Sequence, residues 1–207
     1  MANKHPTGFM NERSVEYFII PELIKTLTPL CKRAVPIFFW KTREGGKISS
    51  EVHSSKVVKI IAVFARRPKL VTGSMAVEGK LNHEIIRFAH KAQLLGIPTV
   101  AGFCAARSLF DLEKESIHWL PPIEADPNED TFFLEDKDTH RLIKFGGSPI
   151  STIPPERLAE QLLSKASGMS FDQGVKAMSE LRRELTHFQF FPGFGSAYKP
   201  VYILIEL

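Results

Sequence analysis

The chain of 207 residues is 43% hydrophobic and 24% charged, with a formal net charge of +4. These proportions are typical of a soluble globular protein that buries a core, and they exclude disordered and fibrous chains. Two cysteines are too few for a disulfide framework or a cysteine-rich zinc site. No apolar run approaches the roughly 18 residues of a membrane span, and residues 1–9 lack the apolar core of a signal peptide. We therefore expect a reduced, cytoplasmic protein with no membrane contact.

The first 40 residues predict a helix followed by a strand. Apolar side chains recur at helical spacing between residues 14 and 33, where Pro21 suits a first helical turn. The continuous apolar run Ala34–Trp40 is rich in β-formers and predicts a strand buried on both faces.

A loop and a second helix are expected next. Residues 41–55 are polar and contain Gly45 and Gly46, so they predict a loop at the carboxyl end of the preceding strand. The apolar positions between Val57 and Ala65 then fit the face of a helix, capped by one of the serines before it.

The stretch Lys69–Phe103 predicts a βαβ unit around which the chain is organised. A short strand is expected at Lys69–Thr72, and Gly73 and Gly79 bracket a loop after it. Apolar residues at three-and-four spacing predict a helix over Asn82–Leu95, which a glycine then ends. A second strand follows at Pro98–Phe103.

The remaining sequence adds several further elements, each with a local signal. We expect a helix within 104–116, a short strand within 116–120, a hairpin of Thr131–Leu134 with Arg141–Phe145, a helix after Pro154, a helix opened by a capping box of Ser170 and Gln173, and a strand within 200–207.

This order predicts an α/β protein with a Rossmann-like, mostly parallel sheet and helices on both faces. A C-terminal hairpin and a helical extension ending in a strand complete it. We expect residues 1–207 to form a single domain, with 35–120 as the βαβ core and 121–207 as the hairpin, two helices and terminal strand. Three strands are expected to be neighbours in the sheet: Val35–Trp40, Lys69–Thr72 and Pro98–Phe103.

Residues 35–103 carry two resemblances to known families. The segment LVTGSMAVEGKLNHEIIRFAHKAQLLGIPTVAGF resembles the nucleotide-binding core of DprA-type and LOG-type Rossmann proteins, in which a strand ends in a small-residue turn before a helix. Ser74, followed by Glu84, two helical alanines and Gly-Ile-Pro, is similar to TIR-like and nucleoside-deoxyribosyltransferase proteins. The second resemblance implies that Glu84 handles a ribosyl centre. Together they imply a nucleotide or nucleotide-derived ligand, and an N-glycosidic bond as the target of any reaction.

The predicted site lies across two glycine-containing loops at the carboxyl ends of parallel strands, where open α/β sheets bind ligands. Backbone N–H groups beside glycines and at a helix start favour phosphate. Glu84 is the candidate catalytic residue, since a fixed carboxylate stabilises the positive charge that develops on a sugar when its glycosidic bond breaks. The alternative is that Glu84 only complements the helix dipole. The other candidate ligand-binding residues are Gly45, Gly46, Lys47, Gly73, Ser74, Gly79, Lys80 and Asn82. The identity of any cofactor, the occurrence of catalysis and homo-oligomer formation are left open.

Two alternatives belong to other classes of function. The first is a nucleic-acid-binding subunit of a larger complex, of the defence or mobile-element kind. It is suggested by the isoelectric point near 9.1 and by basic residues at Lys56, Lys59, Arg66, Arg67, Arg182 and Arg183. The second is a structural interaction protein whose apolar terminal strand pairs with the sheet edge of a partner.

Overall fold

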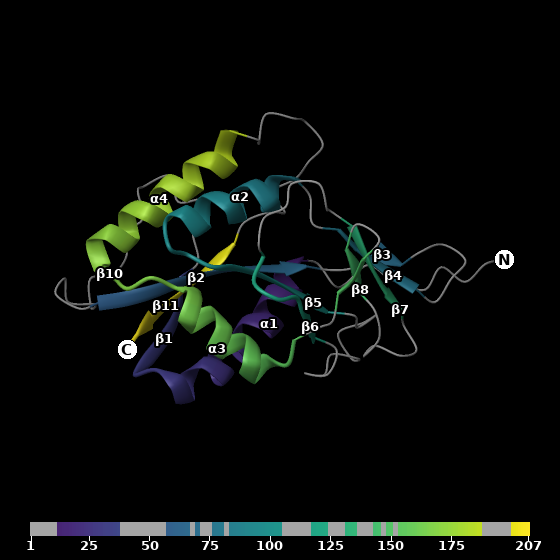
Figure 1. Ribbon diagram of the computed structural model, residues 1–207, viewed down its shortest axis with the longest axis horizontal. Helices are drawn as coiled ribbons and strands as arrows, with labels where there is room; N and C mark the ends of the chain where they lie inside the picture. Colours follow the sequence, from purple (N-terminus) through teal and green to yellow (C-terminus); the bar gives the residue numbers. More distant parts are fainter. Residues whose placement is uncertain are drawn as a thin grey trace.

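The computed structural model describes residues 12–37, 57–66, 69–70, 76–80, 83–104, 117–123, 131–135, 143–145, 148–150, 153–187 and 200–207. Its centre is a six-stranded sheet in the order β1-β11-β2-β5-β6, with β10 paired to β2 (Figure 1). The strands of this main sheet are β1 (Arg33–Ile37), β2 (Val57–Arg66), β5 (Thr99–Cys104), β6 (Ile117–Trp119), β10 (Met169–Ser170) and β11 (Val201–Glu206).

The main sheet is mixed, which corrects the prediction of a mostly parallel sheet. Only β2 and β5 pair in parallel, whereas β1–β11, β11–β2, β5–β6 and β10–β2 are antiparallel. The difference arises because the last strand of the chain, β11, inserts between β1 and β2 and runs against both. Its apolar sequence predicts a buried strand but carries no information about which strands it will join.

Both faces of the main sheet are covered by helices, as predicted (Figure 1). One face packs on α1 (Glu12–Leu27) and α3 (Pro155–Lys165), and the other packs on α2 (His83–Leu94) and α4 (Phe171–His187). A short 3₁₀ helix, η1 (Thr28–Leu30), follows α1. Within the described ranges, no helix combines the length and the apolar content that a bilayer span requires.

Strand β2 occupies the stretch for which a helix was predicted, so that prediction is wrong. Alternate side chains of β2 enter the two opposite hydrophobic clusters, with Ile61 and Val63 on the α1–α3 face and Ile60 and Phe64 on the α2–α4 face. These four side chains are at most 1% exposed. A strand buried on both faces is apolar at every position, so its sequence also satisfies a helical spacing.

The predicted βαβ unit exists with a different first strand. Strand β2 pairs in parallel with β5, and α2 lies in the connection between them. The predicted first strand contributes only β3 (Lys69–Leu70), which belongs to a separate three-stranded sheet with β4 (Ala76–Lys80) and β7 (Thr131–Glu135). The three predicted neighbours therefore do not lie side by side. Part of the expected glycine loop is strand β4 instead.

The expected hairpin also has different partners. Strand β7 pairs with β4, and β8 (Ile143–Phe145) pairs with β9 (Ser148–Ile150). Two glycines separate β8 from β9 in the sequence. Register across such short strands is set by turns and by distant partners, which local composition does not reveal.

Pro21 lies inside α1, where the sequence predicted a helix start. Its ring is exposed, while Ile20 and Leu23 on either side are buried in the core. A proline inside a helix costs about 3 kcal/mol. Burying the apolar side chains on both sides of Pro21 offsets that cost, so a single helix forms.

Several predictions made from local signals are confirmed, namely α2, β5, β6, α3 and the terminal strand β11. The capping box of α4 forms as predicted, since Gln173 donates its backbone N–H to Ser170 Oγ at 3.2 Å, and Ser170 donates its N–H to Gln173 Oε1 at 2.9 Å. Two predictions, the loop of residues 41–55 and most of the helix within 104–116, lie outside the described residues.

Candidate functional site

Three strands of the main sheet end at one edge. Strands β1 and β2 both run antiparallel to β11, and β5 runs parallel to β2, so all three share one direction. Their carboxyl ends are Ile37, Arg66 and Cys104. Helix α2 begins at this edge, because its other end leads through Gly96 into the start of β5. The three-stranded sheet of β3, β4 and β7 lies past this edge of the main sheet (Figure 1). The chain segments that follow β1 and β2 start here.

Of the residues predicted to bind a ligand or to act in catalysis, the structure describes Gly79, Lys80 and Glu84. Glu84 is the second residue of α2, in its first turn. Gly79 and Lys80 end β4, just before α2 in the sequence. The remaining predicted residues lie outside the described part of the chain: Gly45, Gly46, Lys47, Gly73, Ser74 and Asn82.

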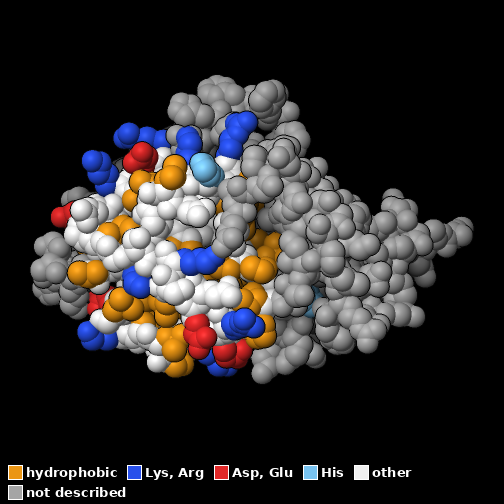
Figure 2. Space-filling model, viewed as in Figure 1, with side chains coloured by type: hydrophobic (Ala, Val, Ile, Leu, Met, Phe, Trp, Pro, Cys, Tyr) orange, Lys and Arg blue, Asp and Glu red, His pale blue; other side chains and the backbone are white. Residues whose placement is uncertain are grey.

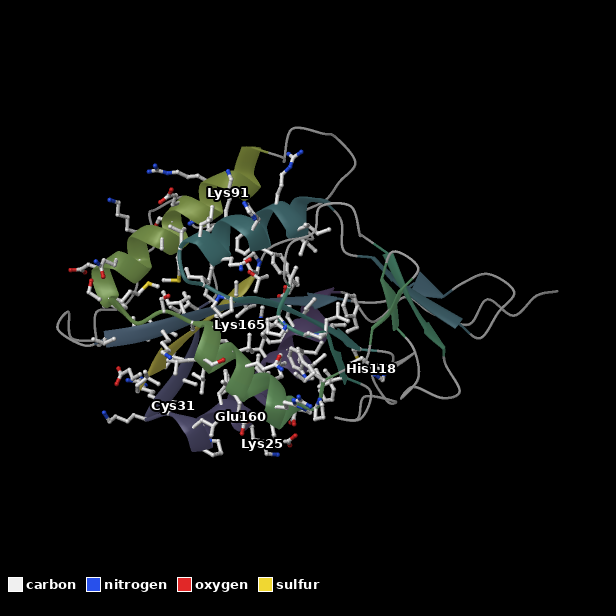
Figure 3. All side chains as sticks on the ribbon, in the orientation of Figure 1. Lys25, Cys31, Lys91, His118, Glu160 and Lys165 are labelled. Atoms are coloured by element: carbon white, nitrogen blue, oxygen red, sulfur yellow. The ribbon has the colours of Figure 1, made fainter. Side chains whose placement is uncertain are left out.

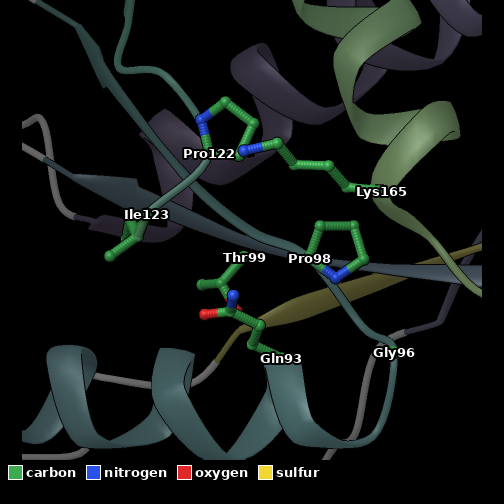
Figure 4. A pocket seen from close by; sticks show the side chains of 7 residues that line it. All are labelled: Gln93, Gly96, Pro98, Thr99, Pro122, Ile123 and Lys165. Atoms are coloured by element: carbon green, nitrogen blue, oxygen red, sulfur yellow. The ribbon is translucent and has the colours of Figure 1, made fainter. Parts of the chain in front are cut away.

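A pocket that the sequence did not predict lies at the opposite edge, where β5 begins (Figure 4). Its volume is about 220 Å³. The lining residues come from the end of α2, the start of β5, the segment after β6 and the end of α3, and they are Gln93, Gly96, Pro98, Thr99, Pro122, Ile123 and Lys165. Because these segments are distant in sequence, no motif links them.

Backbone hydrogen bonds fix the walls of this pocket. Ile123 donates its N–H to Thr99 O at 2.8 Å, which holds the segment after β6 against β5. Ser167 donates its N–H to Gly96 O at 2.9 Å, which joins the end of α3 to the end of α2. Gly96 has φ +72°, a conformation that favours glycine and that ends α2.

The pocket contains one buried polar group without a hydrogen bond. Thr99 is 2% exposed, and its Oγ1 has no hydrogen-bond partner among the described residues. The amide of Gln93 lies beside Thr99, and the amine of Lys165 extends across the pocket toward Pro122 (Figure 4). Lys165 is the only charged residue among those that line the pocket.

Neither cysteine is part of a disulfide. Cys104 is completely buried in the hydrophobic core, as expected for a small apolar side chain. Burial raises the pKa of the Cys31 thiol, an effect that a backbone hydrogen bond from Arg33 partly opposes. A raised pKa lowers the fraction of reactive thiolate at neutral pH.

Basic side chains gather on the side formed by α4 and α2 (Figure 2). Lys91 lies on this side, whereas Lys25 and Glu160 lie on the α1–α3 side (Figure 3). Among the described side chains of α2 and α4, the exposed basic residues outnumber the exposed acidic ones. The basic residues are Arg87, Lys91, Lys176, Arg182 and Arg183, and the acidic residues are Asp172 and Glu180. Glu84 and Glu184 also belong to these helices.

Of the basic residues that suggested nucleic-acid binding, Lys59 is engaged within the protein. Lys59 is on strand β2 and donates its ammonium to Leu163 O at 2.6 Å, so it serves the packing of α3 against the sheet. Lys56 and Arg67 lie outside the described residues.

The hypothesis that the terminal strand, β11, pairs with the sheet edge of a partner is wrong. This strand pairs along its whole length with β2 on one side and from Tyr202 to Glu206 with β1 on the other. Neither side is open to the sheet edge of another protein.

No protein-family model, curated protein or solved structure matches the chain. The function is therefore argued from the arrangement of its own residues.

Proposed function

We propose that the chain binds a nucleotide or nucleotide-derived ligand through a Rossmann-like βαβ unit, at the edge where β1, β2 and β5 end. The observation that carries this proposal is the parallel pair of β2 and β5 with α2 in the connection between them. In open α/β sheets, ligands bind outside the carboxyl ends of such strands. This edge also receives the amino-terminal end of α2.

Each group of candidate residues has a distinct task in this proposal. The backbone N–H groups at the amino-terminal end of α2, together with Gly73 and Gly79, favour a phosphate. Lys47 and Lys80 add positive charge. Glu84 meets the sugar, and if the protein cleaves an N-glycosidic bond, its carboxylate stabilises the positive charge on that sugar in the transition state.

The substitution Glu84→Gln separates three hypotheses for this residue. A glycosidic enzyme loses turnover by orders of magnitude while it still binds ligand. A protein that only binds retains most of its affinity. If Glu84 only complements the helix dipole, the variant loses about 0.3–1 kcal/mol of stability and its response to ligands is unchanged.

The measurements are nucleotide binding, cleavage of NAD or nucleosides, and melting temperature, all on the same variant. Glu180→Gln is the matched control, because Glu180 is an exposed glutamate on α4 and lies outside the first turn of its helix. A ligand response that changes equally in both variants would contradict a specific role for Glu84.

A second candidate function is binding of a nucleic acid on the side formed by α2 and α4. The observation that favours it is the excess of exposed basic over exposed acidic side chains among the residues of these two helices whose side chains the structure describes. Basic groups on one surface bind the phosphate backbone and make the affinity dependent on salt.

A further inference from the structure

The pocket at the start of β5 lies at the opposite end of this strand from the edge assigned to the nucleotide. Strand β5 runs from Thr99, which lines the pocket, to Cys104 at that edge. A ligand of the pocket is therefore distinct from a nucleotide bound at the carboxyl ends of the parallel strands. Its class follows from the size, the charges and the hydrogen-bonding groups of the pocket.

The volume of the pocket limits the ligand to a single ring. Sites for drug-sized molecules occupy about 300–1,000 Å³, whereas this pocket has about 220 Å³. An apolar cavity of about 150 Å³ is large enough for benzene. One six-membered ring with a short substituent therefore fits the pocket, and a nucleotide does not.

The charges around the pocket favour an uncharged ligand. The carboxyl ends of α2 and α3 form part of its wall, and they carry partial negative charge that opposes an anion. The ammonium group of Lys165 opposes a cation. Lys165 also has an interaction partner within the protein, so its charge does not call for a negative ligand.

The polar groups of the pocket favour an amide. The Thr99 hydroxyl is buried without a hydrogen bond, and such a group is costly unless something completes its bond. The amide of Gln93 lies beside Thr99 but makes no hydrogen bond with the hydroxyl (Figure 4). Because Gln93 is exposed, its side chain can rotate away and leave this position to the amide of a ligand. An amide both donates and accepts hydrogen bonds, which suits a hydroxyl that does the same.

The apolar part of the lining consists of Pro98, Pro122 and Ile123. We propose that this pocket binds a small uncharged amide, with the amide group on the Thr99 hydroxyl and an apolar ring against the two prolines and Ile123. The ligand replaces the Gln93 amide beside Thr99 and completes the hydrogen bond that Gln93 does not make.

The test is calorimetric titration and thermal shift of the full chain with benzamide, benzoate and benzylamine, which share one ring and differ in charge. We expect benzamide to bind at millimolar concentration. Benzoate and benzylamine should bind about fivefold more weakly, because a helix end repels the first and an ammonium group repels the second. The proposal is overturned if benzamide does not bind, or if benzoate or benzylamine binds as tightly as benzamide.

Two variants test the role of the Thr99 hydroxyl. Thr99→Val keeps the size of the side chain and should weaken benzamide binding about two- to tenfold, which is the effect of one lost hydrogen bond. Gln93→Ala should strengthen benzamide binding, because it vacates the place beside Thr99, and adding Thr99→Val should cancel that gain. Lys176→Ala is the matched control, since it truncates an exposed helical side chain that does not line the pocket, and it should bind benzamide as the parent does.

These variants also decide where benzamide binds. If Thr99→Val binds benzamide as tightly as Lys176→Ala does, the amide does not lie on Thr99 and the proposal is overturned. The same conclusion follows if Gln93→Ala gains no affinity over Lys176→Ala. Because Gln93 is exposed, Gln93→Ala keeps the fold, so the second comparison stands even if Thr99→Val fails to fold. No nucleotide enters this test, and its failure is therefore distinguishable from failure of the nucleotide proposal.

Discussion

Ser167 donates its backbone N–H to the carbonyl oxygen of Gly96 at 2.9 Å, and this hydrogen bond joins the two helical layers of the protein. Gly96 ends α2 on one face of the main sheet, and Ser167 follows α3 on the other. The contact also closes one side of the pocket at the start of β5. It makes Gly96 a position where both the backbone conformation and the available space require glycine.

Gly96→Ala should destabilise the protein by about 2 kcal/mol, because a left-handed conformation costs an L-residue about 1–2 kcal/mol and the added Cβ would meet the Cβ and Oγ of Ser167. Urea denaturation measures the loss. The same change in a Ser167→Gly background should cost less, since only the backbone strain remains. A variant with unchanged stability would contradict this account of the α2 end.

Ser170→Ala should cost about 1 kcal/mol, because it removes the side-chain cap of α4. The Oγ atom that is lost accepts the backbone N–H of Gln173 at 3.2 Å. Ser164→Ala is the matched control, since its exposed hydroxyl only donates to Gln161 O near the end of α3. We expect the control to stay within about 0.5 kcal/mol of the parent. Equal losses of stability in Ser170→Ala and Ser164→Ala would show that the capping box does not stabilise α4.

Tyr202 should make the protein less stable at high pH. Burial raises its pKa far above the ordinary value of 10.0, and Arg182 opposes this effect only in part. Above pH 10, the unfolded chain loses the phenolic proton while the folded chain retains it, so stability falls as the pH rises. Tyr202→Phe should remove this part of the decline in denaturation experiments across that pH range. Tyr17 is 59% exposed, and the stability of Tyr17→Phe should fall with rising pH as that of the parent does. Identical pH profiles for Tyr202→Phe and the parent would contradict the effect.

If the α2–α4 side binds nucleic acid, the logarithm of affinity should fall linearly with the logarithm of salt concentration. Changing Arg182 and Arg183 together to Ala should flatten that slope by up to about two units. Lys25→Ala on the opposite face should leave it unchanged. An unaltered slope in the double variant would remove both arginines from the interface.

Local signals in the sequence predicted the elements that depend on near neighbours. The α2 helix, its end at Gly96 and the cap of α4 all follow from residues within one or two helical turns. Strand β2 was mistaken for a helix because both of its faces are buried, so the alternation that marks a half-exposed strand is missing. Whether such a run becomes a strand depends on partners that lie far away in the chain.

The sheet order and the pocket depend on distant parts of the chain, and the sequence did not reveal them. Strand β11 enters the sheet next to β1 and makes it mixed, although the two strands lie at opposite ends of the chain. Likewise, Gln93, Thr99 and Lys165 meet only after α2, β5 and α3 have packed together. The common edge of the parallel strands, in contrast, was anticipated in part, because α2 and β5 were located correctly.

The central claim is that the edge where β1, β2 and β5 end binds a nucleotide-derived ligand. The most direct measurement is a thermal-shift series with nucleotides, NAD-type dinucleotides and short DNA and RNA, since a ligand that binds the folded state raises the melting temperature by mass action. We expect at least one nucleotide or dinucleotide to raise the melting temperature in proportion to the logarithm of its concentration, and the nucleic acids to leave it unchanged. A series in which no nucleotide or dinucleotide raises the melting temperature would contradict the claim, and a shift with DNA or RNA alone would favour the basic side formed by α2 and α4 instead.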